Sequence, residues 1–362
     1  MDNIQKLNLI WLDMFDFLTY RKKVSICEEC GVTIDIRRNI TKNKTKLLNI
    51  ISEQEYFKME ALSDDESMNS ALKEYEKESI QVLCLYDKEY PSLLKEINNP
   101  PLLLYCKGNI QLLNTECVGI VGTRKPTDYG KLETRIFTKK LAENGLTIVS
   151  GMSMGVDAIA HATTLEVKGK TIAVLAGGFY HVYPAMNMNL FKKIIENNLA
   201  ITENRPSVSI QPYMFPVRNR IIAGLSRGVL LTEAGVSSGS IHTRNYAIEF
   251  NREIFAIPGK LSSLESEGCN RTIKEFSTSI VLSPNDILDV LHIDYSKNTN
   301  KNDFQLDFSE QTIIKYIKSD KKSFQDLLEH THLVPNQLNA ILISLQMKGL
   351  IDKLPGNYYL AN

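Results

Sequence analysis

The 362-residue sequence lacks an excess of charge of either sign. It holds 42 basic and 42 acidic residues, so its formal net charge is zero. Any affinity for nucleic acid therefore has to come from a local patch and not from a general field. No apolar run is long enough to cross a bilayer, and the N-terminal segment alternates apolar and charged residues where a signal peptide has an apolar core. We therefore expect a cytoplasmic protein without membrane association.

Cysteine is scarce and scattered. The six cysteines do not have the spacing of a disulfide framework, which favours a reducing compartment. Cys27 and Cys30 have the spacing of half a metal-binding knuckle, but no second pair follows. The glutamates between them do not help to activate a thiolate. We expect structural thiols, no metal and no cofactor.

The length and the 43% hydrophobic content predict two or three domains with a sizeable core. Residues 1–75 have apolar positions at helical spacing and predict a small helical domain. Residues 76–292 are expected to form an α/β core. Residues 293–307 are expected to form a flexible linker, because the run from Ser296 to Asp303 has no apolar residue. Residues 308–362 predict three helices and a hairpin, the pattern of a winged helix. The third of these helices has one basic residue, Lys348, so strong duplex binding is not expected from it.

Within the α/β core, three short apolar strands each end in a glycine-containing turn that precedes a helix. Turns of this kind lie at the carboxyl edge of a parallel sheet, where backbone amides and helix N-termini attract anions. One such turn alone is no more than a βα connection requires, but three together favour a polyanion. The turns are Gly122-Thr123-Arg124, Ser150-Gly151 through Gly155, and Ser237-Ser238-Gly239-Ser240.

The most informative run is Phe215-Pro216-Val217-Arg218-Asn219-Arg220. An aromatic face beside guanidinium groups suits a single nucleic-acid strand, because a base stacks on the ring while arginines neutralise phosphates. Pro216 restricts the residue before it to extended conformations, so we expect Phe215 to project from a loop ahead of a helix that begins near Arg220.

Catalytic residues are harder to find, and we expect a protein that is not an enzyme. Asp157 and His161 lie four apart on one helix face, a spacing compatible with proton transfer, but no nucleophile or third ligand accompanies them. We expect both to bond neighbouring loops. Glu233 ends a strand, and we expect its carboxylate to hold an arginine of the Phe215 run.

Together, these motifs resemble those of the DNA-processing protein A (DprA, or Smf) family. The resemblance runs from about Asp87 to Leu291 and implies an extended Rossmann-like, parallel-rich sheet flanked by helices. It also implies a single-stranded DNA-binding protein that protects incoming strands and loads RecA recombinase in natural transformation. A homodimer through the core is a further implication. The segments that carry it include Tyr90-Pro91, Gly122-Thr123-Arg124, Ser150-Gly151, Tyr183-Pro184, Phe215 to Leu225, Ser238-Gly239-Ser240, Ala256-Ile257-Pro258-Gly259 and Gly268-Cys269-Asn270.

The resemblance places a set of residues around one DNA-binding pocket, and Arg244 is a further candidate for a phosphate contact. That arginine lies in Ile241-His242-Thr243-Arg244, where the family usually continues with an apolar pair, Thr and Ala. Two alternatives stay open: a phosphoribohydrolase-like enzyme and a sensor of a nucleotide signal, both in the same kind of fold. The expected pocket consists of Gly122, Thr123, Arg124, Ser150, Gly151, Gly155, Phe215, Pro216, Arg218, Asn219, Arg220, Ser238, Gly239 and Arg244.

Overall fold

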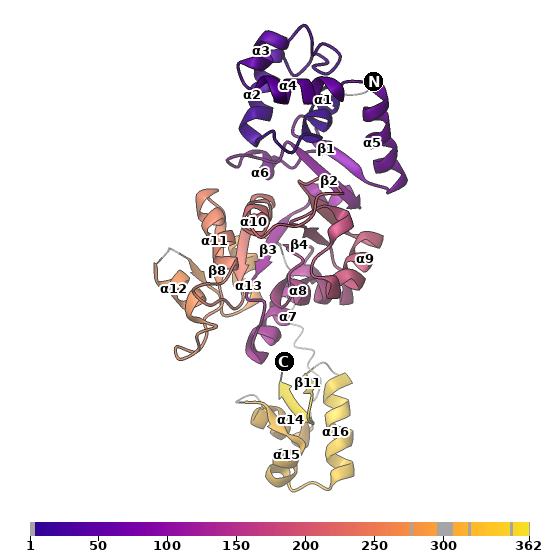
Figure 1. Cartoon of the computed structure of the whole chain (residues 1–362). Helices are drawn as coiled ribbons and strands as arrows, with labels where there is room; N and C mark the ends of the chain where they lie inside the picture. Colours follow the sequence, from indigo (N-terminus) through magenta and orange to yellow (C-terminus); the bar gives the residue numbers. More distant parts are fainter. Residues whose placement is uncertain (1–3, 276–277, 295–306, 318–319, 348–349, 362) are drawn as a thin grey trace. The chain divides into compact units, whose positions relative to one another are not determined.

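A computed structural model describes residues 4–275, 278–294, 307–317, 320–347 and 350–361, with the side chains of residues 308 and 347 excepted. The chain divides into two compact units, Met1–Asp294 and Tyr295–Asn362 (Figure 1). Most of the predicted linker at 293–307 lies outside the described residues.

The first unit is built on a nine-stranded sheet with the order β1-β2-β6-β5-β4-β3-β7-β8-β9. Only β2 runs against its neighbours, and the strands from β6 to β9 are all parallel, as predicted. The strands are β1 (Gln81–Cys84), β2 (Leu103–Gly108), β3 (Cys117–Val121), β4 (Thr147–Ser150), β5 (Thr171–Val174), β6 (Leu199–Thr202), β7 (Gly228–Leu231), β8 (Glu253–Ala256) and β9 (Ser279–Ile280).

Helices cover both faces of this sheet, because successive residues of its inner strands point to opposite faces and both sets are apolar. On β5, Ile172 and Val174 pack in a core with α10, whereas Ala173 packs in a second core with α9 and the N-terminal helices. The helices after β1 are α6 (Ser92–Lys95), α7 (Asp128–Glu143), α8 (Val156–Glu166), α9 (Met188–Asn197), α10 (Met214–Leu225), α11 (Ser240–Glu249), α12 (Glu267–Glu275) and α13 (Pro284–Val290).

The N-terminal helices belong to the same compact unit as the sheet. Trp11 and Tyr105 lie in one hydrophobic core, and the Tyr105 hydroxyl donates to Asp13 Oδ2 at 2.7 Å. The division predicted at residue 75 therefore falls inside this unit, and the predicted four-part division of the chain stays a prediction. The N-terminal helices are α1 (Ile4–Asp13), α2 (Tyr20–Cys30), α3 (Lys44–Leu48), α4 (Glu53–Ala61) and α5 (Asp65–Lys77).

The second unit has the three helices and the hairpin of a winged helix. Its strands pair in the order β10-β12-β11, and Leu338, Leu342 and Leu345 of α16 are buried in its core. Lys348, the expected basic residue of the third helix, lies outside the described residues. The elements are α14 (Phe308–Ile317), β10 (Lys322–Ser323), α15 (Phe324–Thr331), α16 (Pro335–Met347), β11 (Ile351–Leu354) and β12 (Tyr358–Ala361).

All six cysteines are buried free thiols. Burial raises the pKa of Cys27 to about 12 and also raises that of Cys30, which makes both poor nucleophiles. In the part of the chain that the structure describes, no helix is both long and apolar enough to span a bilayer. The same residues include no cluster of three potential metal ligands.

Candidate nucleic-acid interface

A cleft of about 1250 Å³ opens at the carboxyl edge of the sheet, beside β3 and β7. The chain proceeds from β3 through β4 and β5 to β6, and then crosses back to place β7 on the other side of β3. The loops after β3 and β7 therefore diverge, which leaves a crevice at this topological switch point. Ligands of open α/β sheets bind at such points.

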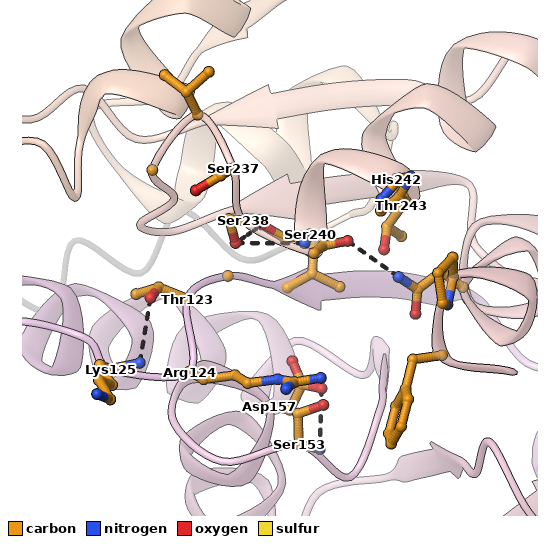
Figure 2. A pocket seen from close by; sticks show the side chains of 18 of the residues that line it. Thr123, Arg124, Lys125, Ser153, Asp157, Ser237, Ser238, Ser240, His242 and Thr243 are labelled. Atoms are coloured by element: carbon orange, nitrogen blue, oxygen red, sulfur yellow. Dashed lines mark hydrogen bonds between the residues drawn. The ribbon is translucent and has the colours of Figure 1, made fainter. Parts of the chain in front are cut away.

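Two loops form facing walls of the cleft. Figure 2 shows Thr123 and Arg124, which follow β3, on one wall and Ser237 and Ser238, which follow β7, on the other. The Ser238 and Ser240 hydroxyls are 2.8 Å apart and share a hydrogen bond. These walls offer hydroxyl groups and cations, which are suited to phosphate oxygens.

The N-terminal half of α10 lines a further side of the cleft. The helix begins at Met214, so the prediction of a loop that ends near Arg220 is wrong: Phe215 and Pro216 lie in the first turn. Proline is tolerated there because the first amides of a helix have no partner within the helix. Phe215 is partly exposed.

Phe215 has an aromatic and a cationic neighbour. Its ring centroid lies 5.8 Å from that of Tyr183 in an edge-on arrangement, and the Arg124 guanidinium lies 5.3 Å from it. The cleft thus places two rings and a cation together, which is the combination that a stacked base with its phosphate requires.

Arg218 lies on the same face of α10 but is buried, with 5% of its surface exposed. Its Nη1 donates to the Val174 carbonyl and its Nε to Asn219 Oδ1 at 3.1 Å. Asn219 Nδ2 in turn donates to the Gly239 carbonyl of the facing wall at 3.2 Å. Burial lowers the pKa of Arg218 to about 10, against the attraction of Asp157. Arg218 therefore positions Asn219 and adds positive charge behind the cleft surface.

The glycines of the second predicted turn shape this arrangement without lining the cleft. A side chain on Gly151 would place its Cβ 2.5 Å from both Arg218 Nη2 and Asp157 Oδ2, so a larger residue there would displace these two buried side chains. Gly155 has a φ of 77°, and a Cβ on it would lie 2.4 Å from the Thr123 carbonyl. Ser150 is buried and donates to the Ile120 carbonyl. These three residues hold the loops together.

Two predicted contacts point elsewhere. Arg220 lies two residues after Arg218, so it projects from the opposite side of the helix, where it pairs with Glu203. Arg244 donates to Asn245 Oδ1 and to Thr272 of α12, and it does not line the cleft. Neither arginine faces the expected pocket.

The three candidate catalytic groups have structural partners. His161 is buried between the Gly151 carbonyl at 2.6 Å and the Thr171 hydroxyl at 2.7 Å, and burial lowers its pKa to about 4. Asp157 accepts from the Ser153 amide, as expected, and burial raises its pKa despite the Arg218 charge. Glu233 does not hold an arginine.

Instead, the Glu233 carboxylate accepts from the amide and the hydroxyl of Thr127, each at 2.7 Å. Thr127 is the N-cap of α7, so the carboxylate fixes the start of that helix. Its oxygens also approach Gly130, where a Cβ would lie 2.1 Å from Oε2. The contact ties the end of β7 to the helix that follows β3.

Some residues of the cleft were not predicted. Lys125 is exposed beside Arg124, and its place directly after a predicted phosphate turn was an available signal. Tyr183 reaches the cleft from a distant segment. His242 comes from α11 (Figure 2). Two carboxylates, Glu265 and Glu267, also line it. Nothing in the local sequence indicates that these last four side chains meet here.

The mostly parallel sheet and its cleft at the switch point define a Rossmann-like α/β protein. Residues 81–292 match the family model of DNA recombination-mediator protein A. The chain therefore belongs to the DprA/Smf family of DNA recombination mediators.

Sequence relatives support this assignment. The chain is 36% identical over 251 residues to the DNA processing protein DprA of Bacillus subtilis, which covers 69% of this chain and 82% of that protein. It is 41% identical over 204 residues to DprA of Streptococcus pneumoniae, which covers 56% of this chain and 72% of the relative. The family name is that of a mediator and not of an enzyme.

Solved structures share the fold. The X-ray structure of DprA from Streptococcus pneumoniae matches with a TM-score of 0.69 and 31% identity, and covers 80% of this chain and 98% of its own. A structure of DprA from Helicobacter pylori matches with a TM-score of 0.54 and 30% identity, and covers 60% of this chain and 97% of its own. The H. pylori structure describes the single-stranded DNA binding mode of that protein.

Proposed function

We propose that this chain binds single-stranded DNA in the switch-point cleft and delivers the strand to RecA recombinase. The observation that carries the proposal is the meeting of Phe215, Tyr183 and Arg124 in one cleft. A base stacks on a ring, and the guanidinium beside it neutralises the adjoining phosphate. The single-stranded DNA binding of the H. pylori relative supports this proposal.

The charge of the cleft suits this role because its cations are better placed than its anions. Arg124 and Lys125 are exposed at the cleft. Of the carboxylates, Glu267 pairs with Arg271 at 2.7 Å, and Asp157 lies behind the surface beside Arg218. The third, Glu265, is partly exposed and accepts from the Thr123 hydroxyl at 3.4 Å. Since the whole chain has no net charge, the local cations determine the salt dependence of binding.

A hydrolytic enzyme is a weaker candidate for this site. Asp157 and Glu233 are both buried and bonded to loop or helix-start atoms, and His161 is enclosed between two partners. His161 and Glu233 do not line the cleft, and Asp157 reaches it with only 7% of its surface exposed. All three groups are held in structural contacts, whereas general acid–base catalysis requires a group that can exchange a proton with a ligand.

Two further features of the family role are part of the proposal. The recombination-mediator family implies a contact with RecA, and we propose a homodimer through the core unit as the acting form. The buried free thiols suit a reducing compartment, so we place this activity in the cytoplasm.

Phe215→Ala tests the stacking contact. A base stacked on an aromatic ring contributes about 1–3 kcal/mol, so the variant should bind a single-stranded oligonucleotide about 5- to 150-fold more weakly. The salt dependence of binding should stay nearly unchanged, because the ring carries no charge. Phe215→Trp should retain most of the affinity. Thermal melting identifies any loss that comes from unfolding.

Two outcomes would contradict the proposal. If folded Phe215→Ala binds the oligonucleotide as tightly as the native protein, the cleft is not the DNA site. If the protein does not accelerate RecA assembly on strands coated by a single-strand binding protein, the delivery role is wrong and only binding remains. Release of base from adenosine monophosphate would instead favour the enzyme.

A further inference from the structure

A second cleft of about 670 Å³ lies on the other flank of α10. It is enclosed by the start of α2, the loop before β2, the end of β6, and the helices α10 and α11. All of these elements belong to the same compact unit. No residue that lines the first cleft also lines this one.

The helical period of α10 separates the two clefts. Successive residues turn by about 100°, so residues three apart share a face and residues two apart lie on nearly opposite faces. Phe215 and Arg218 accordingly line the first cleft, whereas Met214, Val217 and Arg220 line the second. The same short run of sequence supplies both sites.

The second cleft contains an arginine with unused hydrogen-bonding capacity. Arg220 is 9% exposed, and one of its terminal nitrogens, Nη2, pairs with Glu203. The other, Nη1, is buried without a hydrogen-bond partner. A buried, unpaired donor on a charged group is costly, and a ligand that supplies an acceptor would remove that cost once the guanidinium shifts to bring Nη1 to the cleft surface.

Aromatic rings line the same cleft as this arginine. Tyr246 and Phe250 of α11 are stacked with their centroids 5.7 Å apart, and Tyr20 faces the same cleft from α2. Tyr213 stands at the entrance with 66% of its surface exposed. Flat rings around a donor and the acceptor Glu203 suit a planar heterocycle that carries both acceptor and donor groups.

We propose that this cleft is a second nucleobase site, which holds a base of the strand bound in the first cleft. The two clefts adjoin at the start of α10, since Pro212 lines the first and Tyr213, the next residue, lines the second. A strand that passes over this point presents one base to Phe215 and a later base to Tyr213. The inference rests on the proposed function of the first cleft.

Oligonucleotide length separates the two sites. A series of oligothymidylates, from the shortest that the native protein binds to one at which affinity no longer rises, is titrated against Tyr213→Ala and Phe215→Ala. Tyr213→Ala should weaken binding of the long oligonucleotides about 5- to 150-fold and leave the shortest unchanged. Phe215→Ala should weaken every length. Tyr213→Trp should restore the long-strand affinity.

Phe57→Ala is the matched control, because it also removes an exposed ring, and Phe57 lines neither cleft. The inference is overturned if Tyr213→Ala affects no length, or affects all lengths equally. It is also overturned if thymidine monophosphate binding is lost in Tyr213→Ala while long strands bind as before, since the cleft then serves a free nucleotide. If instead Phe215→Ala affects no length, the proposed function of the first cleft fails.

Discussion

Arg124 and Arg218 lie near the same phenylalanine but differ in their surroundings. Arg124 is exposed over the Phe215 ring, whereas Arg218 is buried and donates to the Val174 carbonyl. When an exposed cation contacts a phosphate, the counterions on the nucleic acid are released. A buried cation that is already hydrogen-bonded within the protein makes no such contact. Removal of Arg124 should therefore change the salt dependence of DNA binding, whereas removal of Arg218 should mainly disturb the packing around Val174.

Arg124→Ala should weaken binding of all single-stranded sequences and flatten the logarithmic salt dependence by about 0.7, the value for one lost phosphate contact. Oligonucleotide titrations over a range of salt concentrations measure this slope. Arg135→Ala, which removes an exposed arginine of α7 outside the cleft, should leave the slope unchanged. An unaltered slope in Arg124→Ala would show that Arg124 does not contact a DNA phosphate.

His161 makes the stability of the fold depend on pH. Its pKa is about 4 in the folded protein, below the ordinary value of 6.5, because burial disfavours the charged form. Between pH 6.5 and 4, His161 is protonated in the unfolded chain and mostly neutral in the folded protein. His161 should therefore lower the free energy of unfolding progressively from pH 6.5 to 4, by up to about 3 kcal/mol.

Urea unfolding at pH 7 and at pH 4.5 measures this effect. The loss of stability on acidification should be smaller in His161→Gln than in the native protein, because that proton is no longer bound on unfolding. His292→Gln, which changes an exposed histidine, is the control for the substitution itself. Equal losses in all three proteins would exclude His161 as the titrating group.

At the scale of elements, the start of α8 supports the loop that carries Arg124. Gly155 has a positive φ and also faces the Thr123 carbonyl, where a Cβ would lie 2.4 Å away. Gly145 has a similar φ of 87° but no atom within 4 Å of its Cβ position. Gly155 also has a ψ of −126°, outside the left-handed helical region, so an alanine there would meet both greater backbone strain and this collision.

Gly145→Ala should cost only the strain of a left-handed residue, about 1–2 kcal/mol, and leave DNA affinity unchanged. Gly155→Ala should cost more, and it should also weaken DNA binding because the loop after β3 has to move. Denaturant unfolding and oligonucleotide titration measure both effects. If Gly145→Ala and Gly155→Ala lost the same stability and bound DNA with the same affinity, the contact between Gly155 and the loop after β3 would have no role in binding.

The elements also show what the sequence could predict. The strands β3, β4 and β7 were predicted correctly because each is a short apolar run followed by a glycine-containing turn. The start of α10 was placed too late because Pro216 was taken to exclude a helix. With the true start at Met214, helical periodicity alone separates Arg218 from Arg220. The meeting of Tyr183 with Phe215 depends on tertiary packing and has no local signal.

At the scale of the molecule, the N-terminal helices and the sheet form one compact unit. The single tryptophan, Trp11, lies in α1, where it is fully buried and donates to the Leu62 carbonyl at 2.8 Å. Its hydrophobic core includes Tyr105 and Ala173 of the sheet. Tryptophan fluorescence therefore reports on the unit that contains the cleft.

Loss of Trp11 fluorescence in urea should coincide with loss of DNA binding, because a shared core unfolds as a whole. Far-UV circular dichroism should show the same transition for this unit. Phe57→Ala, on the exposed side of the N-terminal helices, should shift both curves equally or neither. A fluorescence change that precedes the loss of binding would show that the first 75 residues unfold independently, as an N-terminal domain with this boundary predicts.

The burial of every native thiol has a practical consequence for labelling. A maleimide reacts with an accessible thiolate. Burial shields the native cysteines from the reagent and raises the pKa of their thiols, so that they stay protonated. A cysteine introduced by Ser237→Cys, on the exposed wall of the first cleft, would be the preferred point of attachment in the otherwise native chain. A fluorophore there would follow the arrival and departure of a strand in real time.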